Sequence, residues 1–241
     1  MQIPRWSHTY TVLRRGIFLS VLLILPCREA LVSQPRLHAI SVSAGLIEDS
    51  RIFVSPQSPD PVERQRTTNL GATTGYGASY RYRLYQSVTL QLHGEFVHTR
   101  SSSRDLAGTR MENGFDIWLL EVAGMFSLPF SSDRFEMYVG GGAGVYVGRR
   151  SYAVADAISE TVSAVPAFGI HILVGAEYLL TRHLGIRADV VFRDPQMSVE
   201  NRFRQSSVTA NGIVYELGTA PFLSHVNLNG NIYSLGVSWH F

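Results

Sequence analysis

The stretch Leu184-Gly-Ile-Arg-Ala-Asp-Val-Val-Phe-Arg193 determines the fold, because its residues alternate between two kinds of side chain. The even-numbered residues are all apolar, whereas the odd-numbered residues include Arg187, Asp189 and Arg193. Successive side chains of a β-strand point to opposite sides, while a helix would scatter both sets around its surface. The segment is therefore predicted to be a strand with one apolar and one polar face.

The same alternation recurs in seven further segments, at about 38–46, 69–84, 88–99, 115–128, 135–147, 165–180 and 229–241. Their polar faces are sparse and rich in glycine, unlike the solvated outer face of a soluble β-sandwich. Charged residues make up only 17% of the chain, against about 25% in soluble domains. No apolar run reaches the roughly 18 residues that a membrane-spanning helix needs. The pattern therefore predicts an all-β fold whose apolar face contacts lipid.

The connections between the eight predicted strands are alternately long and short. The long ones cover 47–68, 100–114, 148–164 and 194–228, and the short ones cover 85–87, 129–134 and 181–183. Outer-membrane barrels have an even number of strands, short periplasmic turns and long external loops, and a closed sheet leaves no unpaired edge in the bilayer. We expect an eight-stranded antiparallel up-and-down transmembrane β-barrel in the bacterial outer membrane, with both termini periplasmic and the long loops extracellular.

The first residues have the pattern of a secretory signal. Residues 1–15 carry three arginines, and the apolar run Gly16–Leu25 follows them. This run is too short to cross a bilayer, and a charged segment before a short apolar one is typical of a secretory signal. We expect a cleaved signal peptide at 1–30, with its cleavage site undecided, and a barrel domain at 31–241. An alternative is that Cys27, which follows Ile24-Leu25-Pro26, is acylated as in a lipoprotein.

The charge and the single cysteine exclude several classes of function. The first 27 residues hold three arginines and no acid, so their removal takes the formal net charge from +2 to −1. The remaining arginines and acids are mixed along the long connections, which argues against a nucleic-acid-binding surface. One cysteine excludes an internal disulfide and a multi-cysteine zinc site.

The end of the chain carries a resemblance to a known family. The stretch Tyr233-Ser-Leu-Gly-Val-Ser-Trp-His-Phe241 resembles the C-terminal strand of bacterial outer-membrane proteins, and the segments 139–146 and 174–186 resemble the small OmpA-like and OmpW-like barrels. The resemblance implies outer-membrane lipid and lipopolysaccharide as surroundings. It also implies that the barrel-assembly machinery reads a signal made of Tyr233, Leu235, Val237, Trp239 and Phe241.

An eight-stranded barrel is just wide enough for its own side chains to fill. The inward faces here carry Arg193 and a cluster of both signs: Arg81, Arg83, Glu95, Glu121, Glu136, Glu177, Arg187 and Asp189. Unpaired charges in so narrow an interior are costly, so we expect them to pair. If 181–183 is a three-residue turn, Glu177 faces Arg187 directly. The cluster is predicted to be a packed polar plug, with a narrow path for ions or small solutes as the alternative.

Other candidate chemistry is sparse, and we expect no catalytic residue, no cofactor and no metal site. Three inward histidines lack metal-ligand spacing: His93, His171 and His240. The glycines at 140, 142 and 144 recur within a strand, so they are predicted to make room for bulky neighbours rather than to bind phosphate. A second alternative is an enzyme that modifies lipid A acyl chains, but Ser224 and His225 have the wrong order and spacing for that family's pair.

The sequence therefore favours a monomeric, non-enzymatic barrel with a structural, adhesion or loop-mediated binding role. Loops on a rigid scaffold are where binding usually occurs. Guanidinium groups suit phosphate, so arginines near the outer rim are candidates to meet lipopolysaccharide phosphates: Arg100, Arg149 and Arg150. Six aromatic residues are expected in the interfacial belts: Trp118, Trp239, Tyr80, Tyr82, Tyr178 and Phe241.

Overall fold

The computed structural model describes residues 36–228 and 230–241. The expected signal peptide at 1–30, its cleavage site and Cys27 lie outside the described residues. Within the described part, no helix is long and apolar enough to cross a membrane. The short helix α1 (Pro61–Arg64) begins after Asp60, whose carboxylate accepts a hydrogen bond from the backbone N–H of Val62 at 2.9 Å.

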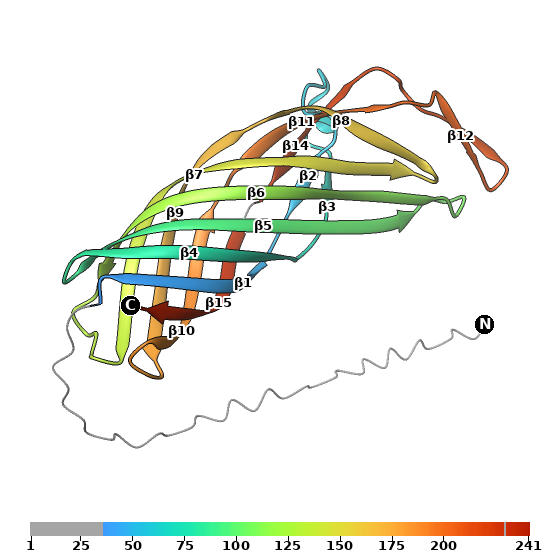
Figure 1. Ribbon diagram of the computed structural model, residues 1–241. Helices are drawn as coiled ribbons and strands as arrows, with labels where there is room; N and C mark the ends of the chain where they lie inside the picture. Colours follow the sequence, from blue (N-terminus) through green and yellow to red (C-terminus); the bar gives the residue numbers. More distant parts are fainter. Residues whose placement is uncertain (1–35, 229) are drawn as a thin grey trace, which may run out of the picture. The chain divides into compact units, whose positions relative to one another are not determined.

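Eight antiparallel strands close into a barrel (Figure 1). In order around the barrel they are β1 (His38–Ile47), β4 (Thr73–Tyr85), β5 (Val88–Arg104), β6 (Arg110–Ser127), β7 (Phe135–Val154), β9 (Ala167–Leu179), β10 (Leu184–Arg193) and β15 (Gly230–His240). Pairing of β7 with β9 and of β1 with β15 completes the ring. Each of the eight predicted strands corresponds to one of these, which confirms the predicted fold class.

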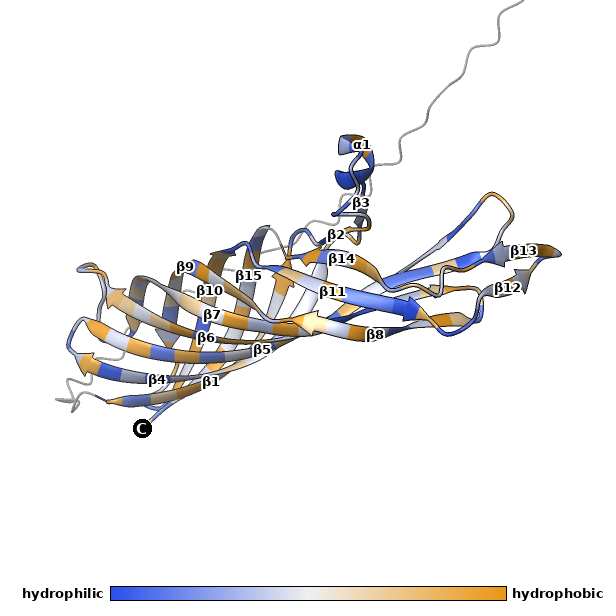
Figure 2. Ribbon diagram, turned by 90° about the horizontal axis from the view of Figure 1, so that it is seen from above, coloured by the Kyte–Doolittle hydropathy of each residue, from blue (hydrophilic) through white to orange (hydrophobic). Residues whose placement is uncertain are grey.

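The two faces of the strands differ as the alternation predicted. On β10, Ile186 and Phe192 are exposed on the outer side, whereas Arg187 and Arg193 are buried inside. Figure 2 shows the resulting bands of hydrophobic and hydrophilic residues along the barrel strands. A continuous apolar outer surface is the requirement that lipid imposes on a barrel.

The long connections are not simple loops, contrary to the prediction. They contain β2 (Arg51–Phe53), β3 (Thr67–Asn69), β8 (Ala157–Val165), β11 (Gln196–Phe203), β12 (Ser207–Ala210), β13 (Ile213–Glu216) and β14 (Phe222–Asn227). Five of these strands continue the barrel wall from β7 in the order β8-β11-β14-β2-β3, which we call the loop-end sheet. Most are too short for alternation to stand out. In addition, β2 and β14 pair although they are far apart in the sequence, so only the folded chain defines them.

The remaining two strands, β12 and β13, form a separate hairpin that reaches back to the β5–β6 turn. The Tyr215 hydroxyl donates to Asp105 Oδ2 at 2.6 Å and lies 2.8 Å from Thr109 Oγ1. The Asn211 side chain donates to the carbonyl of Ala107 at 3.1 Å. These contacts dock the hairpin against the rim of the barrel.

Candidate functional site

The inward faces of the barrel strands bring the eight charged residues of the predicted cluster into ion pairs. Their side chains are at most 29% exposed, and Arg193 is 1% exposed. Every one of them lies within ion-pair distance of an opposite charge. A network of this kind is compatible with a buried interior because each desolvated charge has a partner.

Two arginines of β4 reach across the barrel to the opposite wall. Arg81 binds Glu177 with two hydrogen bonds of 2.6 and 3.0 Å, and Arg83 binds Glu136 at 2.7 Å. Glu136 and Glu177 stand directly opposite each other on β7 and β9, and facing carboxylates repel. The two guanidinium groups of β4 therefore neutralise a like-charged pair, and the bidentate geometry fixes the orientation of Glu177.

The predicted pairing of Glu177 with Arg187 is right in register and wrong in partner. The two residues face each other across β9 and β10. Arg187 nevertheless binds Asp189, two residues along its own strand, at 2.6 Å. In so narrow a barrel, the side chain of Arg81 spans the interior, so a partner across the lumen competes with one across the strand pair. Glu177 also accepts from His240 Nε2 at 2.7 Å and from the Ser238 hydroxyl.

A second group of charges lies nearer the loop end. Arg193 is held between Glu95 at 2.8 Å and Glu121 at 3.1 Å. The Tyr146 hydroxyl donates to Glu121 at 2.7 Å. Gly144 makes room for this group, because a Cβ there would lie 2.6 Å from Glu121 Cγ. The glycine thus serves the close packing that the sequence predicted.

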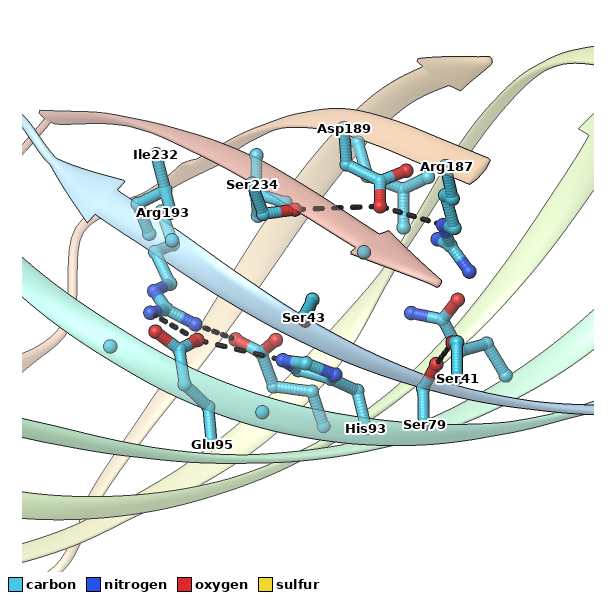
Figure 3. A pocket seen from close by; sticks show the side chains of 18 residues that line it. Ser41, Ser43, Ser79, His93, Glu95, Arg187, Asp189, Arg193, Ile232 and Ser234 are labelled. Atoms are coloured by element: carbon cyan, nitrogen blue, oxygen red, sulfur yellow. Dashed lines mark hydrogen bonds and ion pairs between the residues drawn. The ribbon is translucent and has the colours of Figure 1, made fainter. Parts of the chain in front are cut away.

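Small residues on β1, β4 and β15 leave a polar cavity of about 40 Å³ beside the network (Figure 3). Such a volume has room for about three water molecules. Gln91, Glu95 and Arg187 line it, and each has one buried polar side-chain atom without a hydrogen-bond partner in the described chain. A second cavity of about 20 Å³ lies at the turn end, lined by Arg83 and Glu136 among others.

Above the charges, an apolar layer closes the barrel at the loop end. We call it the cap; it consists of Ile47, Ile52, Val97, Phe115, Ile117, Leu119, Tyr146, Ala167, Met197, Val199, Val226, Leu228 and Ile232. None of these residues is more than 8% exposed. Ile52, Met197, Val199 and Val226 come from the loop-end sheet, and Leu228 follows β14 directly. The loop-end sheet is therefore folded over the mouth of the barrel.

The inward histidines belong to the polar interior. His171 is 4% exposed and lies 3.7 Å from Glu121, while His93 lies 3.5 Å from Glu95. Within residues 36–228 and 230–241, no three His, Cys, Asp or Glu side chains are grouped so that they could hold a metal ion.

Solved structures share this architecture. The outer membrane protein OprG from Pseudomonas aeruginosa matches with a TM-score of 0.59 at 12% identity, over 86% of this chain and 96% of that protein. Ail, the attachment invasion locus protein of Yersinia pestis, matches with a TM-score of 0.44 at 13% identity, over 86% and 100%. This chain has the fold of a small outer-membrane β-barrel. No protein-family model matches the sequence, and a search of curated proteins found no match.

The three rim arginines of this outer-membrane-type barrel do not lie together. Arg100 and Arg149 bind Asp116, at 3.2 and 2.9 Å. Arg150 instead points inward and is 3% exposed, with its guanidinium 4.8 Å from the centre of the Tyr152 ring. Strand alternation places neighbours 149 and 150 on opposite faces, so Arg150 is not available on the outer surface.

The residue pair considered for acyl-chain chemistry does not form a catalytic arrangement. Ser224 is fully buried in β14, and its hydroxyl donates to the carbonyl of Val199 at 3.1 Å. His225, the next residue of the strand, lies 2.7 Å from Gln196 Nε2. Adjacent strand residues point to opposite faces, so the imidazole cannot act as the base for this serine.

The C-terminal strand presents the residues of the expected assembly signal to the outside of the barrel. Tyr233, Leu235, Val237, Trp239 and Phe241 are between 47% and 62% exposed. The other aromatic residues expected in the belts are also exposed: Tyr80, Tyr82, Trp118 and Tyr178. Recognition by the assembly machinery and the placement of the belts at the membrane interface stay predictions.

Proposed function

We propose that this barrel is a non-conducting, non-enzymatic protein of the outer membrane that acts through a folded extracellular surface. The loop-end sheet and the β12–β13 hairpin form that surface, and both chain termini face the periplasm. Its role is adhesion or binding at the cell surface, by a single copy without cofactor or metal.

The observation that carries this proposal is the construction of the cap. Met197 and Val199 of the loop-end sheet are at most 1% exposed and belong to the same buried apolar cluster as Phe115 and Ile117 of the barrel wall. The part of the chain that would bind a partner is thus the same part that closes the barrel. Fixing a surface to a packed core reduces the conformational entropy that binding has to overcome. A flexible gate over a pore would not require such a core.

The surface itself carries both signs of charge on exposed side chains. Arg202 of β11 and Arg204, which directly follows that strand, share Glu160 of β8, at 2.9 and 2.6 Å. Such pairs in water contribute little to stability, so they can rearrange around a partner. Recognition by mixed charges gives specificity and faster association more than affinity.

The first test is the single-channel conductance of the refolded full chain in a planar bilayer, beside a Glu177→Ala variant. Folding is checked separately by the different gel migration of unboiled and boiled samples. We expect both proteins to be silent, because the variant leaves the cap intact. Discrete openings of the wild-type barrel would overturn the sealed-interior part of the proposal.

A narrow channel is the second candidate, and the two polar cavities in series favour it. Arg81 of the Arg81–Glu177 pair lines the smaller cavity, and Arg187, which faces Glu177 across β9 and β10, lines the larger one. Openings that appear only in Glu177→Ala would assign this pair as the barrier. Openings that appear only after Met197→Ala, in the cap, would place the barrier there.

Surface binding is tested on whole cells that carry the full chain. Cells are applied to an array of immobilised glycans and extracellular proteins, and adherent components are scored. One test variant replaces the tip of the hairpin at 211–212, and a second combines Arg202→Gln with Arg204→Gln. The matched control is Ser79→Ala, which removes one hydroxyl from the interior cavity. Binding that survives the loss of the hairpin and of the Arg202 and Arg204 side chains would count against this surface.

A further inference from the structure

On the outer face of β5, β6 and β7, a row of apolar side chains is followed, toward the loop end, by a row that is mainly basic. Across β5, β6 and β7, one row of directly paired apolar residues faces outward, with Phe96 half-buried and the other two exposed: Phe96, Trp118 and Val147. The aromatic rings of Phe96 and Trp118 lie 4.5 Å apart. Two residues further toward the loop end, the next row on the same face is His98, Asp116 and Arg149.

Asp116 accepts hydrogen bonds from three basic side chains: His98 and Arg149 of this second row, and Arg100, two residues beyond His98 on β5. It accepts from His98 Nδ1 at 2.6 Å, from Arg149 Nε at 2.9 Å and from Arg100 Nη2 at 3.2 Å. Asp116 is itself 6% exposed. One carboxylate therefore holds two permanently charged guanidinium groups and an imidazole, and the group carries a net positive charge.

The basic side chains still have donors to offer. The Arg149 side chain is 71% exposed and uses only Nε. Among residues 36–228 and 230–241, its two Nη groups have no hydrogen-bond partner. His98 is 53% exposed. Arg100 is 36% exposed, and its Nη1 donates to the carbonyls of Thr99 and Phe115 at 2.9 and 3.3 Å while its Nη2 donates to Asp116, so it contributes mainly its positive charge. Because Asp116 fixes these side chains, less conformational entropy is lost when an anion joins them.

The position of this group relative to the membrane indicates which anion it meets. Tryptophan favours the boundary between acyl chains and headgroups, and Trp118 is 65% exposed on the outer face. Two residues of a tilted strand rise by about 5 Å. The basic row therefore lies at the level of lipid phosphates, and guanidinium pairs with phosphate through two parallel hydrogen bonds.

The opposite side of the barrel has a different composition at the same boundary. There the outward residues beyond the apolar rows of β1, β15 and β10 are Glu48, Asn231 and Asp194, and Asn231 donates to Glu48 at 3.0 Å. The basic row thus belongs to one side of the molecule. We propose that His98, Arg100 and Arg149, positioned by Asp116, form a binding site for the phosphate of a lipid headgroup.

The test measures binding of dioctanoyl phosphatidic acid to the folded full chain in non-ionic detergent by calorimetry, with dioctanoylglycerol as the probe that lacks phosphate. The variants are Arg149→Gln and Arg100→Gln. The matched control is Arg204→Gln, because Arg204 is 79% exposed and also binds its carboxylate through Nε. We expect binding to weaken by about tenfold in Arg149→Gln, which is the loss of one charged hydrogen bond, and by a smaller factor in Arg100→Gln, whose Nη groups already bond within the chain. Binding should be unchanged in the control.

Three outcomes would overturn the site as proposed. If wild type and Arg149→Gln bind phosphatidic acid with equal affinity, Arg149 is not part of the site. An equal loss in Arg204→Gln would reduce the effect to general surface charge. Inorganic phosphate that binds as tightly as phosphatidic acid would make it a site for the free ion rather than for a lipid. None of these outcomes depends on the conductance of the barrel. The failure of this site would therefore be distinguishable from the failure of the proposed sealed interior.

Discussion

Two arginine–glutamate ion pairs with the same shortest distance lie in contrasting parts of this molecule. Inside the barrel, Arg81 binds Glu177 at 2.6 Å, and the two side chains are 6% and 1% exposed. On the loop-end sheet, Arg204 binds Glu160 at 2.6 Å, and the side chains are 79% and 30% exposed. The inner pair is bidentate and the outer carboxylate is shared with Arg202, but the largest difference between the two pairs is their exposure to water.

This difference divides the barrel into a part that is fixed and a part that is free to bind. Breaking a buried pair leaves a charge without solvent or partner, whereas an exposed pair is replaced by water at little cost. The interior network therefore holds one arrangement. The exposed ion pairs of the loop-end sheet can separate at little cost, so their side chains are available to contact a binding partner.

The largest effect is expected for Glu177→Ala, which leaves the Arg81 guanidinium buried and unpaired. We expect the free energy of unfolding to fall by about 3–5 kcal/mol, measured by urea unfolding of the barrel in lipid vesicles. The double variant Arg81→Met with Glu177→Leu should recover much of the loss, because no uncompensated charge remains. A single variant as stable as the wild type would mean that water reaches this pair.

The next effect is expected in the cap. Met197→Ala removes a side chain that is 1% exposed and packed among apolar neighbours. The free energy of unfolding should fall by about 2–5 kcal/mol, through lost burial and the cavity that remains. Val208→Ala, a half-buried position on the hairpin, is the control. Similar losses in both variants would contradict the distinction between a packed cap and a looser periphery.

A smaller effect is expected from pH at the docking of the β12–β13 hairpin. The hydrogen bond from Tyr215, and then those from the backbone N–H groups of Thr109 and Ala107, hold the pKa of Asp105 below its usual range. A carboxylate with a lowered pKa stabilises the docked form above the undocked value of about 3.9. That stabilisation is lost as pH falls through the lower docked value.

Amide chemical shifts of residues 207–216, followed by NMR during an acid titration in micelles, measure this transition. We expect the midpoint to lie below about 3.9 and to move upward in Tyr215→Phe, which removes the donor. An unchanged midpoint in that variant would show that the backbone N–H groups alone lower the pKa of Asp105.

The smallest effect is expected for Glu160→Gln on the loop-end sheet. Arg202 and Arg204 would lose their carboxylate but stay hydrated, so the urea midpoint should not change measurably. A loss comparable to that of Glu177→Ala would show that exposure does not separate the two kinds of pair.

The sequence predicted the barrel well because a barrel wall is a local pattern. Residues 184–193 show the two faces of β10 without reference to any other strand, since alternation follows from the geometry of a single extended chain. The loop-end sheet was not predicted. Its strands β2 and β14 pair Phe53 with His225, residues that are distant in sequence, and three residues such as Arg51–Phe53 carry no period.

The candidate site was predicted in composition and not in its contacts. Alternation alone placed Glu177 and Arg187 inside, and the short turn fixed their register. Only the closed barrel showed that Arg81 reaches Glu177 across the interior, because the pairing depends on barrel width and strand stagger. In the same way, alternation separates Arg149 from Arg150, but only the alignment of β5, β6 and β7 brings Arg149, Arg100 and Asp116 together.

The sequence by itself thus determined that the chain forms eight barrel strands with a lipid-facing side and a charged inner side, because both follow from residue order along each strand. The tertiary structure alone decided which charges meet, that an apolar cap closes the mouth, and that a basic row lies above Trp118. These features depend on the register and curvature of the closed sheet, and they arise only when distant strands are held side by side.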